Sequence, residues 1–277
     1  SNTVDDHASY GVYLTDSKRL RINHNEIKNS LGDAVYLSSN CDSAFVDNNT
    51  IKSNGDSDSG RSLRMFEVED TVLYNNTIDS NDYSGIVITE SSNNKIIQNI
   101  VKGNGKYGIQ ILNDATKSAN NTIKDNTVND NSDIAIFNHG IFTKIINNTV
   151  KYNEQDGIKI ASDGARSSIS SNNLVDNEGK SIIILAKNVA IESNTIDADS
   201  SEIAISILNA NFASIENNTI EGGNLGIKVQ NSTSAFIYNN TIKSNSGYGI
   251  QVLINSESAR VKYNQLTNER IMYEDPF

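Results

Sequence analysis

Two tyrosines and an arginine are the residues whose types and spacing best suit proton transfer. Tyr13, Tyr36 and Arg64 occupy the same position in three successive units of a sequence repeat, and His7 and Asp33 fall in the adjoining turns. A tyrosine beside an arginine could abstract a proton next to a carboxylate that the arginine neutralises. We therefore predict a catalytic group of Tyr13, Tyr36, Arg64 and His7. Two alternatives stay open: a face that only contacts a ligand, and an ordinary exposed strand face, since tyrosine favours strands.

The same repeat position continues through the rest of the chain. We expect its polar residues to bind substrate, with the lysines contacting distal sugars of an acidic chain: Gln110, Lys159, Lys228 and Gln251. The complete predicted row is Tyr13, Tyr36, Arg64, Val87, Gln110, Phe137, Lys159, Ile183, Ser206, Lys228 and Gln251, of which Phe137, Ser206 and Lys228 lie in units with a shifted register.

Metal chemistry has less support in the sequence. Asp56, Asp58 and the acidic segment 67–70 offer the oxygen ligands that calcium prefers, but without a regular calcium-loop spacing. We predict solvated loops, no metal site and no cofactor, with calcium as the open alternative. His24 is predicted to replace an Asn at a corner, and His139, which has no carboxylate nearby in sequence, is predicted to be structural.

These residues are positioned by a unit that recurs about every 24 residues. Each unit has an Asn, then any residue, then Ile, Val or Leu, with another aliphatic residue three positions before the Asn. The anchors are Asn2, Asn25, Asn49, Asn76, Asn99, Asn126, Asn148, Asn172, Asn194, Asn218, Asn240 and Asn264. Such a period indicates a solenoid, in which each repeat buries its apolar face only against its neighbours.

Each unit contains three predicted strands. One has alternating aliphatic residues, as in Ile109 and Ile111; a second contains the aliphatic residue before the anchor, and a third the one after it. This predicts an all-β, single-stranded parallel β-helix of about 11 to 12 coils, with an Asn ladder at one corner. Asn is expected at the corner because it tolerates the left-handed conformation. Ile exceeds Leu and no helical spacing is present, so we reject a leucine-rich repeat.

Composition limits the partners and the organisation of the chain. With 23 Lys and Arg against 34 Asp and Glu, the net charge of −11 opposes binding to nucleic acid or an anionic membrane. The unbroken repeat predicts one domain over residues 1–277. Both ends resemble interrupted repeats, so we expect a fragment of a longer protein, with neighbouring domains or self-association covering its open β-helix ends. The single cysteine, Cys41, excludes an internal disulfide framework.

Over essentially its full length the chain resembles the right-handed parallel β-helix superfamily, which includes pectate lyases, polygalacturonases, mannuronan epimerases, NosD-type proteins and phage tailspikes. The likeness is carried by segments such as Ile237-Tyr238-Asn239-Asn240-Thr241-Ile242. The repeats are most similar to the mannuronan epimerase module, whose signature is Tyr-Gly-x-Asp-Pro-His-Glu. None of the three Tyr-Gly pairs completes it: Tyr13 and Thr15 stand where the acid and imidazole belong, and Gln110 and Gln251 follow the other two pairs.

The resemblance also implies a groove over one sheet, flanked by lengthened coils. Insertions at residues 55–61 and 113–118 are predicted to wall such a cleft from opposite sides of the sheet formed by the strands with alternating aliphatic residues. Two functions remain open. The first is an extracellular, cell-surface or periplasmic module that acts on or binds an acidic polysaccharide, as a lyase or epimerase. The second is a non-catalytic structural or adhesive rod, such as a surface protein or phage fibre.

Overall fold

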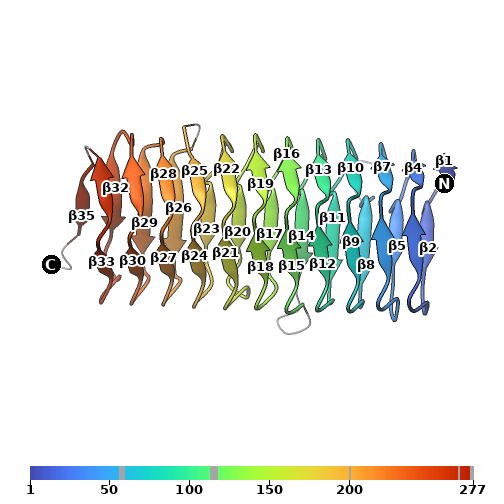
Figure 1. The fold of residues 1–277 in the computed structure, drawn as a ribbon, viewed down its shortest axis with the longest axis horizontal. Helices are drawn as coiled ribbons and strands as arrows, with labels where there is room; N and C mark the ends of the chain where they lie inside the picture. The colour runs from blue at the N-terminus through green and yellow to red at the C-terminus, as the bar shows by residue number, and fades with distance from the viewer. Residues whose placement is uncertain (56–59, 113–117, 200, 268, 275–277) are drawn as a thin grey trace.

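The chain folds into an elongated rod made of three parallel sheets that wind around one core (Figure 1). This computed structural model describes residues 1–55, 60–112, 118–199, 201–267 and 269–274. The N-terminus and C-terminus lie at opposite ends of the rod. Among the described residues there is no helix that could cross a membrane. The predicted all-β parallel β-helix is confirmed, with twelve strands in two sheets and eleven in the third.

Sheet A contains the strand that follows each anchor Asn. Its strands are β1 (Thr3–Asp5), β4 (Glu26–Lys28), β7 (Thr50–Lys52), β10 (Thr77–Asp79), β13 (Ile100–Lys102), β16 (Thr127–Asn129), β19 (Thr149–Lys151), β22 (Asn173–Val175), β25 (Thr195–Asp197), β28 (Thr219–Glu221), β31 (Thr241–Lys243) and β34 (Gln265–Thr267).

Sheet B contains the strands with alternating aliphatic residues, which include all the predicted catalytic tyrosines. Its strands are β2 (Val12–Leu14), β5 (Val35–Leu37), β8 (Leu63–Phe66), β11 (Ile86–Thr89), β14 (Ile109–Leu112), β17 (Ile136–Asn138), β20 (Ile158–Ile160), β23 (Ile182–Ile184), β26 (Ile203–Leu208), β29 (Leu225–Gln230), β32 (Tyr248–Val252) and β35 (Ile271–Tyr273).

Sheet C contains the strand that precedes each anchor. Its strands are β3 (Arg21–Asn23), β6 (Phe45–Asp47), β9 (Val72–Tyr74), β12 (Lys95–Ile97), β15 (Thr122–Lys124), β18 (Lys144–Ile146), β21 (Ser168–Ser170), β24 (Ala190–Glu192), β27 (Ser214–Glu216), β30 (Phe236–Tyr238) and β33 (Arg260–Lys262).

The three sheets bury their side chains in different patterns. Most strands of sheets A and C bury only the central residue, as Ile78 and Ile96 do at 0% exposure. Sheet B buries the two residues on either side of the centre, so its central side chain faces outward. Because side chains alternate across a strand, the central side chains of sheet B form one outward row, in which Val87, Gln110, Ile183 and Ser206 are nevertheless buried.

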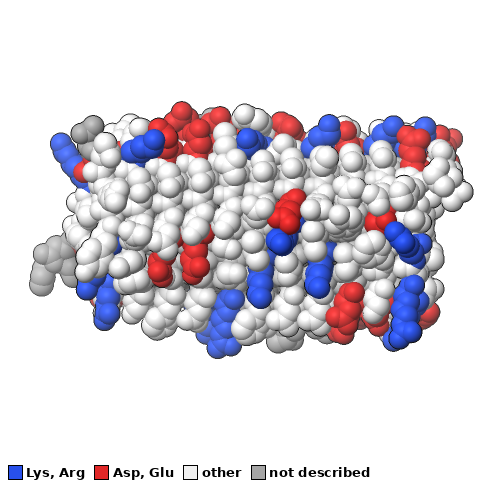
Figure 2. All heavy atoms as spheres, in the orientation of Figure 1, with Lys and Arg blue, Asp and Glu red and all other residues white. Residues whose placement is uncertain are grey.

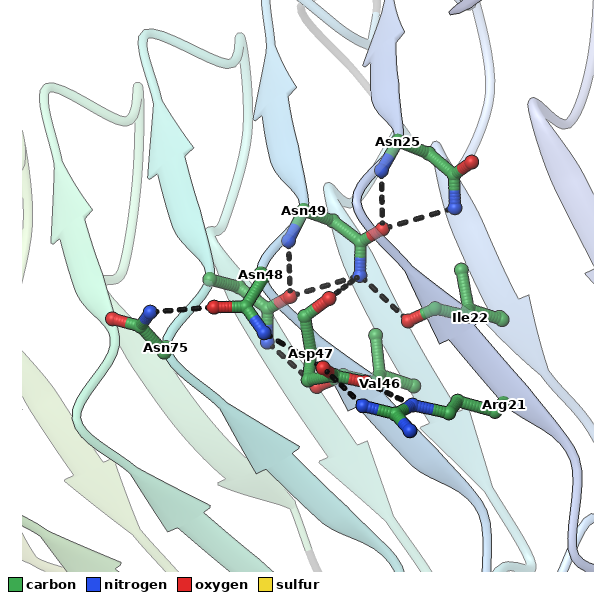
Figure 3. Close-up of polar contacts among 9 residues, drawn as sticks. Arg21, Ile22, Asn25, Val46, Asp47, Asn48, Asn49 and Asn75 are labelled. Carbon is green, nitrogen blue, oxygen red and sulfur yellow. Dashed lines mark hydrogen bonds and ion pairs between the residues drawn. The ribbon is translucent and has the colours of Figure 1, made fainter. Parts of the chain in front are cut away.

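The predicted Asn ladder runs along the corner between sheets C and A (Figure 3). At each step the main-chain N–H and the side-chain amide of one anchor donate to Oδ1 of the next, as Asn25 does to Asn49 at 3.0 and 3.1 Å. The ladder is continuous from Asn2 to Asn264. A second ladder, which we did not predict, joins Asn54, Asn81, Asn104, Asn131, Asn153 and Asn177.

One expectation about this corner is wrong. The left-handed residue is not the anchor but the residue before it, for example His24 at φ 54°, Asn48 at 54° and Asn75 at 51°. The anchor side chain must point inward to join the ladder, so the turn is made one position earlier. The predicted corner role of His24 is confirmed.

Candidate functional site

The outward row of sheet B follows the order expected from the sequence. Its Cα pairs run in direct register from one coil to the next, and the row consists of Tyr13, Tyr36, Arg64, Val87, Gln110, Phe137, Lys159, Ile183, Ser206, Lys228 and Gln251. The register shift expected at Phe137, Ser206 and Lys228 is wrong, because all three pair directly with their neighbours in the row. Phe137 lies 11 residues after its anchor, as Gln110 does, whereas Ser206 and Lys228 lie 12 and 10 residues after theirs, and the chain between anchor and strand absorbs that difference.

Three tyrosines cluster at the start of this row. The ring centroids of Tyr13 and Tyr36 are 5.3 Å apart, and Tyr10 lies 5.2 Å from Tyr13 and 5.7 Å from Tyr36. Sequence reasoning used Tyr10 only as part of a Tyr-Gly pair. It precedes β2 by two residues, and Gly11, whose added Cβ would meet Ala34 O at 2.6 Å, allows the close approach of the next coil there. The cluster offers an aromatic surface larger than the predicted pair.

Arg64 connects this cluster to a buried carboxylate. Its guanidinium carbon lies 4.5 Å from the Tyr36 ring centroid, and its Nη1 lies 3.6 Å from Oδ2 of Asp33. The Arg64 side chain is 26% exposed, whereas that of Asp33 is 4% exposed. Arg64 Nε has no hydrogen-bond partner among the described residues. Nε itself is buried, so an external carboxylate would be received by the exposed part of the guanidinium.

Burial controls the protonation of Asp33. Loss of solvent raises the pKa of its carboxyl group above the ordinary value, although the main-chain N–H of Arg61 donates to it at 2.8 Å and two guanidinium groups lie near it. These side chains border an open hollow of about 390 Å³ lined by Ala8, Ser9, Tyr10, Leu31, Gly32, Asp33, Arg61 and Arg64.

His7 lies outside this arrangement. Its carbonyl oxygen accepts a hydrogen bond from Leu31 N at 2.8 Å, and its side chain is exposed and is not part of the lining of the hollow. The structure thus brings Tyr13, Tyr36, Arg64 and Asp33 together, and gives no contact that would include His7 with them among the described residues.

Aromatic and cationic side chains continue from the hollow along the edge of sheet B. Arg61 lies over the Tyr83 ring at 5.9 Å, and Lys106 lies over the rings of Tyr83 and Tyr107 at 4.5 and 5.3 Å. Lys106 Nζ also donates to the Tyr83 hydroxyl at 2.7 Å, which raises the pKa of Lys106. This lysine therefore stays charged at neutral pH, where a uronate is also ionised.

Phe137 connects these contacts with the predicted substrate residue Lys159. Its ring centroid is 5.4 Å from that of Tyr107, and Lys159 Nζ lies 5.5 Å from the Phe137 centroid. We define the aromatic–cationic strip as Tyr10, Tyr13, Tyr36, Arg61, Arg64, Tyr83, Lys106, Tyr107, Phe137 and Lys159. Asp33 joins its two arginines, and the strip spans the seven coils from β2 to β20.

The other predicted substrate residues differ in accessibility. Gln110 is only 8% exposed, between Val87 and Phe137 in the row, which limits its contact with a ligand. Lys228 is half-buried and lies three coils beyond Lys159. Gln251 is half-buried and donates to the sulfur of Met272 at 3.2 Å. Lys228 and Gln251 are thus separated from the strip by Ile183 and Ser206.

His139 has a partner that the sequence did not suggest. Its Nδ1 lies 2.9 Å from Oδ1 of Asp163, a residue 24 positions later and therefore one coil away. The imidazole ring also contacts Phe137, at 4.5 Å between centroids. The absence of a carboxylate nearby in sequence was misleading, since one coil of a β-helix brings residues about 24 positions apart into contact. The histidine–aspartate pair flanks the strip.

The predictions about metal and about the cleft walls remain untested. Asp56 and Asp58 lie outside the described residues, as do residues 56–59 and 113–117 of the two insertions. Within the described ranges no group of three or more His, Cys, Asp or Glu residues could hold a metal ion. The flanking residues show that the first insertion precedes β8 and the second follows β14, on opposite borders of sheet B.

Comparisons with known proteins agree with the observed fold. The family model described as "Right handed beta helix region" matches residues 1–143 and 167–271. No match was found among curated protein sequences.

Several solved structures share the fold at low sequence identity. A variant of the periplasmic alginate epimerase AlgG aligns over 98% of this chain and 74% of its own, with a TM-score of 0.68 and 12% identity. An alginate lyase from a Paenibacillus strain aligns over 99% and 98%, with a TM-score of 0.64 and 12% identity. The surface adhesin PfbA of Streptococcus pneumoniae aligns over 96% and 85%, with a TM-score of 0.61 and 12% identity.

Proposed function

Because the chain belongs to the right-handed β-helix family, we propose that it recognises an acidic polysaccharide along the aromatic–cationic strip of sheet B. The observation that carries the proposal is the unbroken series of contacts from Tyr10 to Lys159, which concentrates aromatic rings and four cations on a molecule with a net charge of −11. The cations would pair with uronate carboxylates. The tyrosine and phenylalanine rings would contact the apolar faces of the sugars.

The spacing of the coils also suits a linear polymer. Neighbouring strands of a sheet are about 4.8 Å apart, so the strip from β2 to β20 would extend about 29 Å along the rod. A glycan lying parallel to the rod axis would meet Arg64, Lys106 and Lys159 in succession. Proteins of this fold include an alginate epimerase, an alginate lyase and a surface adhesin, which agrees with a function outside the cytoplasm or in the periplasm.

Binding to short oligouronates, measured by titration calorimetry, tests this proposal. We expect Arg64→Gln and Lys159→Gln each to weaken binding about tenfold or more, because each removes a charge-assisted contact worth roughly 1.5–3 kcal/mol. Lys28→Gln is the matched control, since Lys28 pairs with Asp5 on sheet A, away from the strip. Equal affinities for all three variants, or no binding of acidic glycans at all, would contradict the proposal.

A second candidate function is proton transfer at the hollow, as a lyase or epimerase. It is favoured by the hollow next to Tyr10, in which Arg64 could neutralise a carboxylate beside Tyr36. Removal of the proton next to the uronate carboxylate gives a carbanion. That carbanion either expels the glycosidic oxygen, which produces an unsaturated sugar, or regains a proton on the opposite face.

A screen of alginate, pectate and other acidic glycans, with and without calcium, separates the two functions. Ultraviolet absorbance would detect unsaturated products and proton NMR would detect epimerised residues. Turnover that disappears in Tyr13→Phe or Tyr36→Phe would establish the enzyme and identify its base. Binding without turnover would instead identify a non-catalytic adhesive module.

A further inference from the structure

The corner between sheets B and C carries bulky side chains where the backbone favours small ones. In each coil the residue two positions before the sheet C strand is left-handed, with φ between 53° and 60°. Seven of these positions hold Asn, Asp or Ser, namely Ser43, Asp70, Asn93, Asn120, Asn188, Ser234 and Ser258, whereas Arg19, Phe142, Arg166 and Phe212 hold large residues. Large L-residues are disfavoured in this conformation, and such outliers are concentrated at functional sites.

Two of these outliers lie on consecutive coils and contact each other. The guanidinium carbon of Arg166 is 5.5 Å from the ring centroid of Phe142, and the Phe142 side chain is 40% exposed. Together with four neighbours they line a hollow of about 220 Å³, which we call the corner patch: Asn120, Thr122, Phe142, Lys144, Arg166 and Ser168. Thr122, Lys144 and Ser168 are paired in direct register on β15, β18 and β21.

The corner patch is locally positive on an acidic molecule. Among the described residues no carboxylate forms an ion pair with Lys144 or Arg166, and Lys95 stands two coils away in the same row without one. Lys124, by contrast, pairs with Asp125 at 3.5 Å. Figure 2 shows this face: cationic side chains stand over β12–β21 with an acidic group among them, and further acidic side chains lie along the rod on either side.

We propose that the corner patch is a second binding site, for one carboxylated sugar residue of an acidic polysaccharide. The carboxylate would pair with Arg166 and Lys144, and the sugar ring would lie against Phe142. The amide of Asn120 and the hydroxyls of Thr122 and Ser168 offer donors and acceptors for sugar hydroxyls. These three polar groups favour a sugar over an acidic peptide. The site lies on a different face from the aromatic–cationic strip and does not depend on it.

Phe142→Asn and Arg166→Asn test this site without endangering the fold. Asn is the residue found at the same left-handed position in neighbouring coils, so both variants should be at least as stable as the parent protein. The measurement is titration calorimetry with a short oligouronate in the Arg64→Gln, Lys159→Gln background, in which the strip is disabled. We expect each corner substitution to weaken the remaining binding about tenfold or more, and added salt to weaken it further.

Phe212→Asn is the matched control. Phe212 has the same backbone conformation and is 56% exposed, but the sheet C strands of its coil and the one before it carry Glu216 and Glu192 and no cation. This variant should bind as the parent does. The proposal is overturned if Phe142→Asn and Arg166→Asn leave binding unchanged, if a neutral oligosaccharide binds equally well, or if poly-glutamate does. If only the proposal about the strip is wrong, the Arg64→Gln, Lys159→Gln double variant would still bind through the corner patch. The two proposals are therefore tested separately.

Discussion

Arg21 and Asp47 show how one pair of side chains contributes to this fold. The guanidinium donates two hydrogen bonds of 2.9 Å to the two carboxylate oxygens, across the first two strands of sheet C (Figure 3). The Asp47 side chain is 1% exposed, and that of Arg21 is 58% exposed. Hydrogen bonds from Arg21 hold the pKa of Asp47 below its ordinary value. A buried carboxylate here depends on a partner that solvent can still reach.

We predict that Arg21→Met lowers the free energy of unfolding by about 1–2 kcal/mol at neutral pH, because it leaves Asp47 buried without its main donor. The pKa of Asp47 is lowered in the folded state. The stabilisation is therefore present above the unfolded pKa and is lost as pH falls through the folded pKa. Urea denaturation at neutral and acidic pH should show the difference between parent and variant shrink in acid.

The control for this prediction is Lys124→Met. Lys124 and Asp125 form an exposed pair at 3.5 Å, and such pairs contribute little to stability. If the destabilisation caused by Arg21→Met stays constant down to acidic pH, lost packing and not the lost charge is responsible for it.

The corner between sheets C and A illustrates the contribution of a whole structural element. Each rung of the Asn ladder satisfies donors and acceptors that belong to three coils. Asn126, for example, accepts from Asn99, donates to Asn148 and donates to the carbonyl of Ile96. Because these amides are buried, water cannot replace a missing member. Replacing a single ladder Asn should therefore destabilise the corner.

We expect Asn126→Ala to lower the free energy of unfolding by about 3 kcal/mol, since it removes the acceptor of the buried main-chain N–H of Asn99 and the side-chain donor to the carbonyl of Ile96. Asn147→Gly is the control, because Asn147 is exposed and left-handed in the same corner and glycine keeps that conformation. Thermal and urea denaturation would measure both. Similar decreases in the free energy of unfolding in the two variants would mean that a ladder Asn contributes no more stability than an exposed corner residue does.

The strands and their register were predictable because one short pattern determines both. A spacing of about 24 residues and the aliphatic residues on either side of the anchor placed all three sheets and the outward row of sheet B. Contacts that depend on the side-chain path across a coil could not be deduced in the same way. Asp163 near His139, Tyr10 beside Tyr13 and Phe142 beside Arg166 are such contacts. The left-handed position was misplaced because a run such as Asn48-Asn49 does not reveal which Asn turns inward.

At the scale of the whole molecule, stability is distributed along one dimension. Each coil contacts mainly the coils before and after it, so local openings need not involve the whole rod. Core residues of the central coils, such as Ile96 and Ile145, are 0% exposed. Core residues near the two ends are only partly buried, among them Val4, Val12, Val261 and Leu266. The resistance to opening should therefore vary with position along the rod.

Native-state hydrogen exchange would measure this gradient. We predict the slowest exchange for amides of β12 to β24 and exchange faster by at least tenfold, equivalent to about 1.4 kcal/mol of opening free energy, for β1 to β3 and β33 to β35. Uniform protection along the chain would instead indicate that the rod opens as one cooperative unit.

The Asn ladder also aligns a row of amide dipoles along the rod axis. Successive peptide groups of a strand point to opposite neighbouring coils, so their dipoles largely cancel along the rod axis. In the ladder, by contrast, each Oδ1 accepts from the coil on its N-terminal side, and each anchor N–H donates toward the C-terminal side. Aligned amides polarise their neighbours and strengthen one another. One corner of this molecule therefore carries a continuous row of aligned amide dipoles through the protein interior. A charge placed beside this row would interact differently with its N-terminal and C-terminal ends.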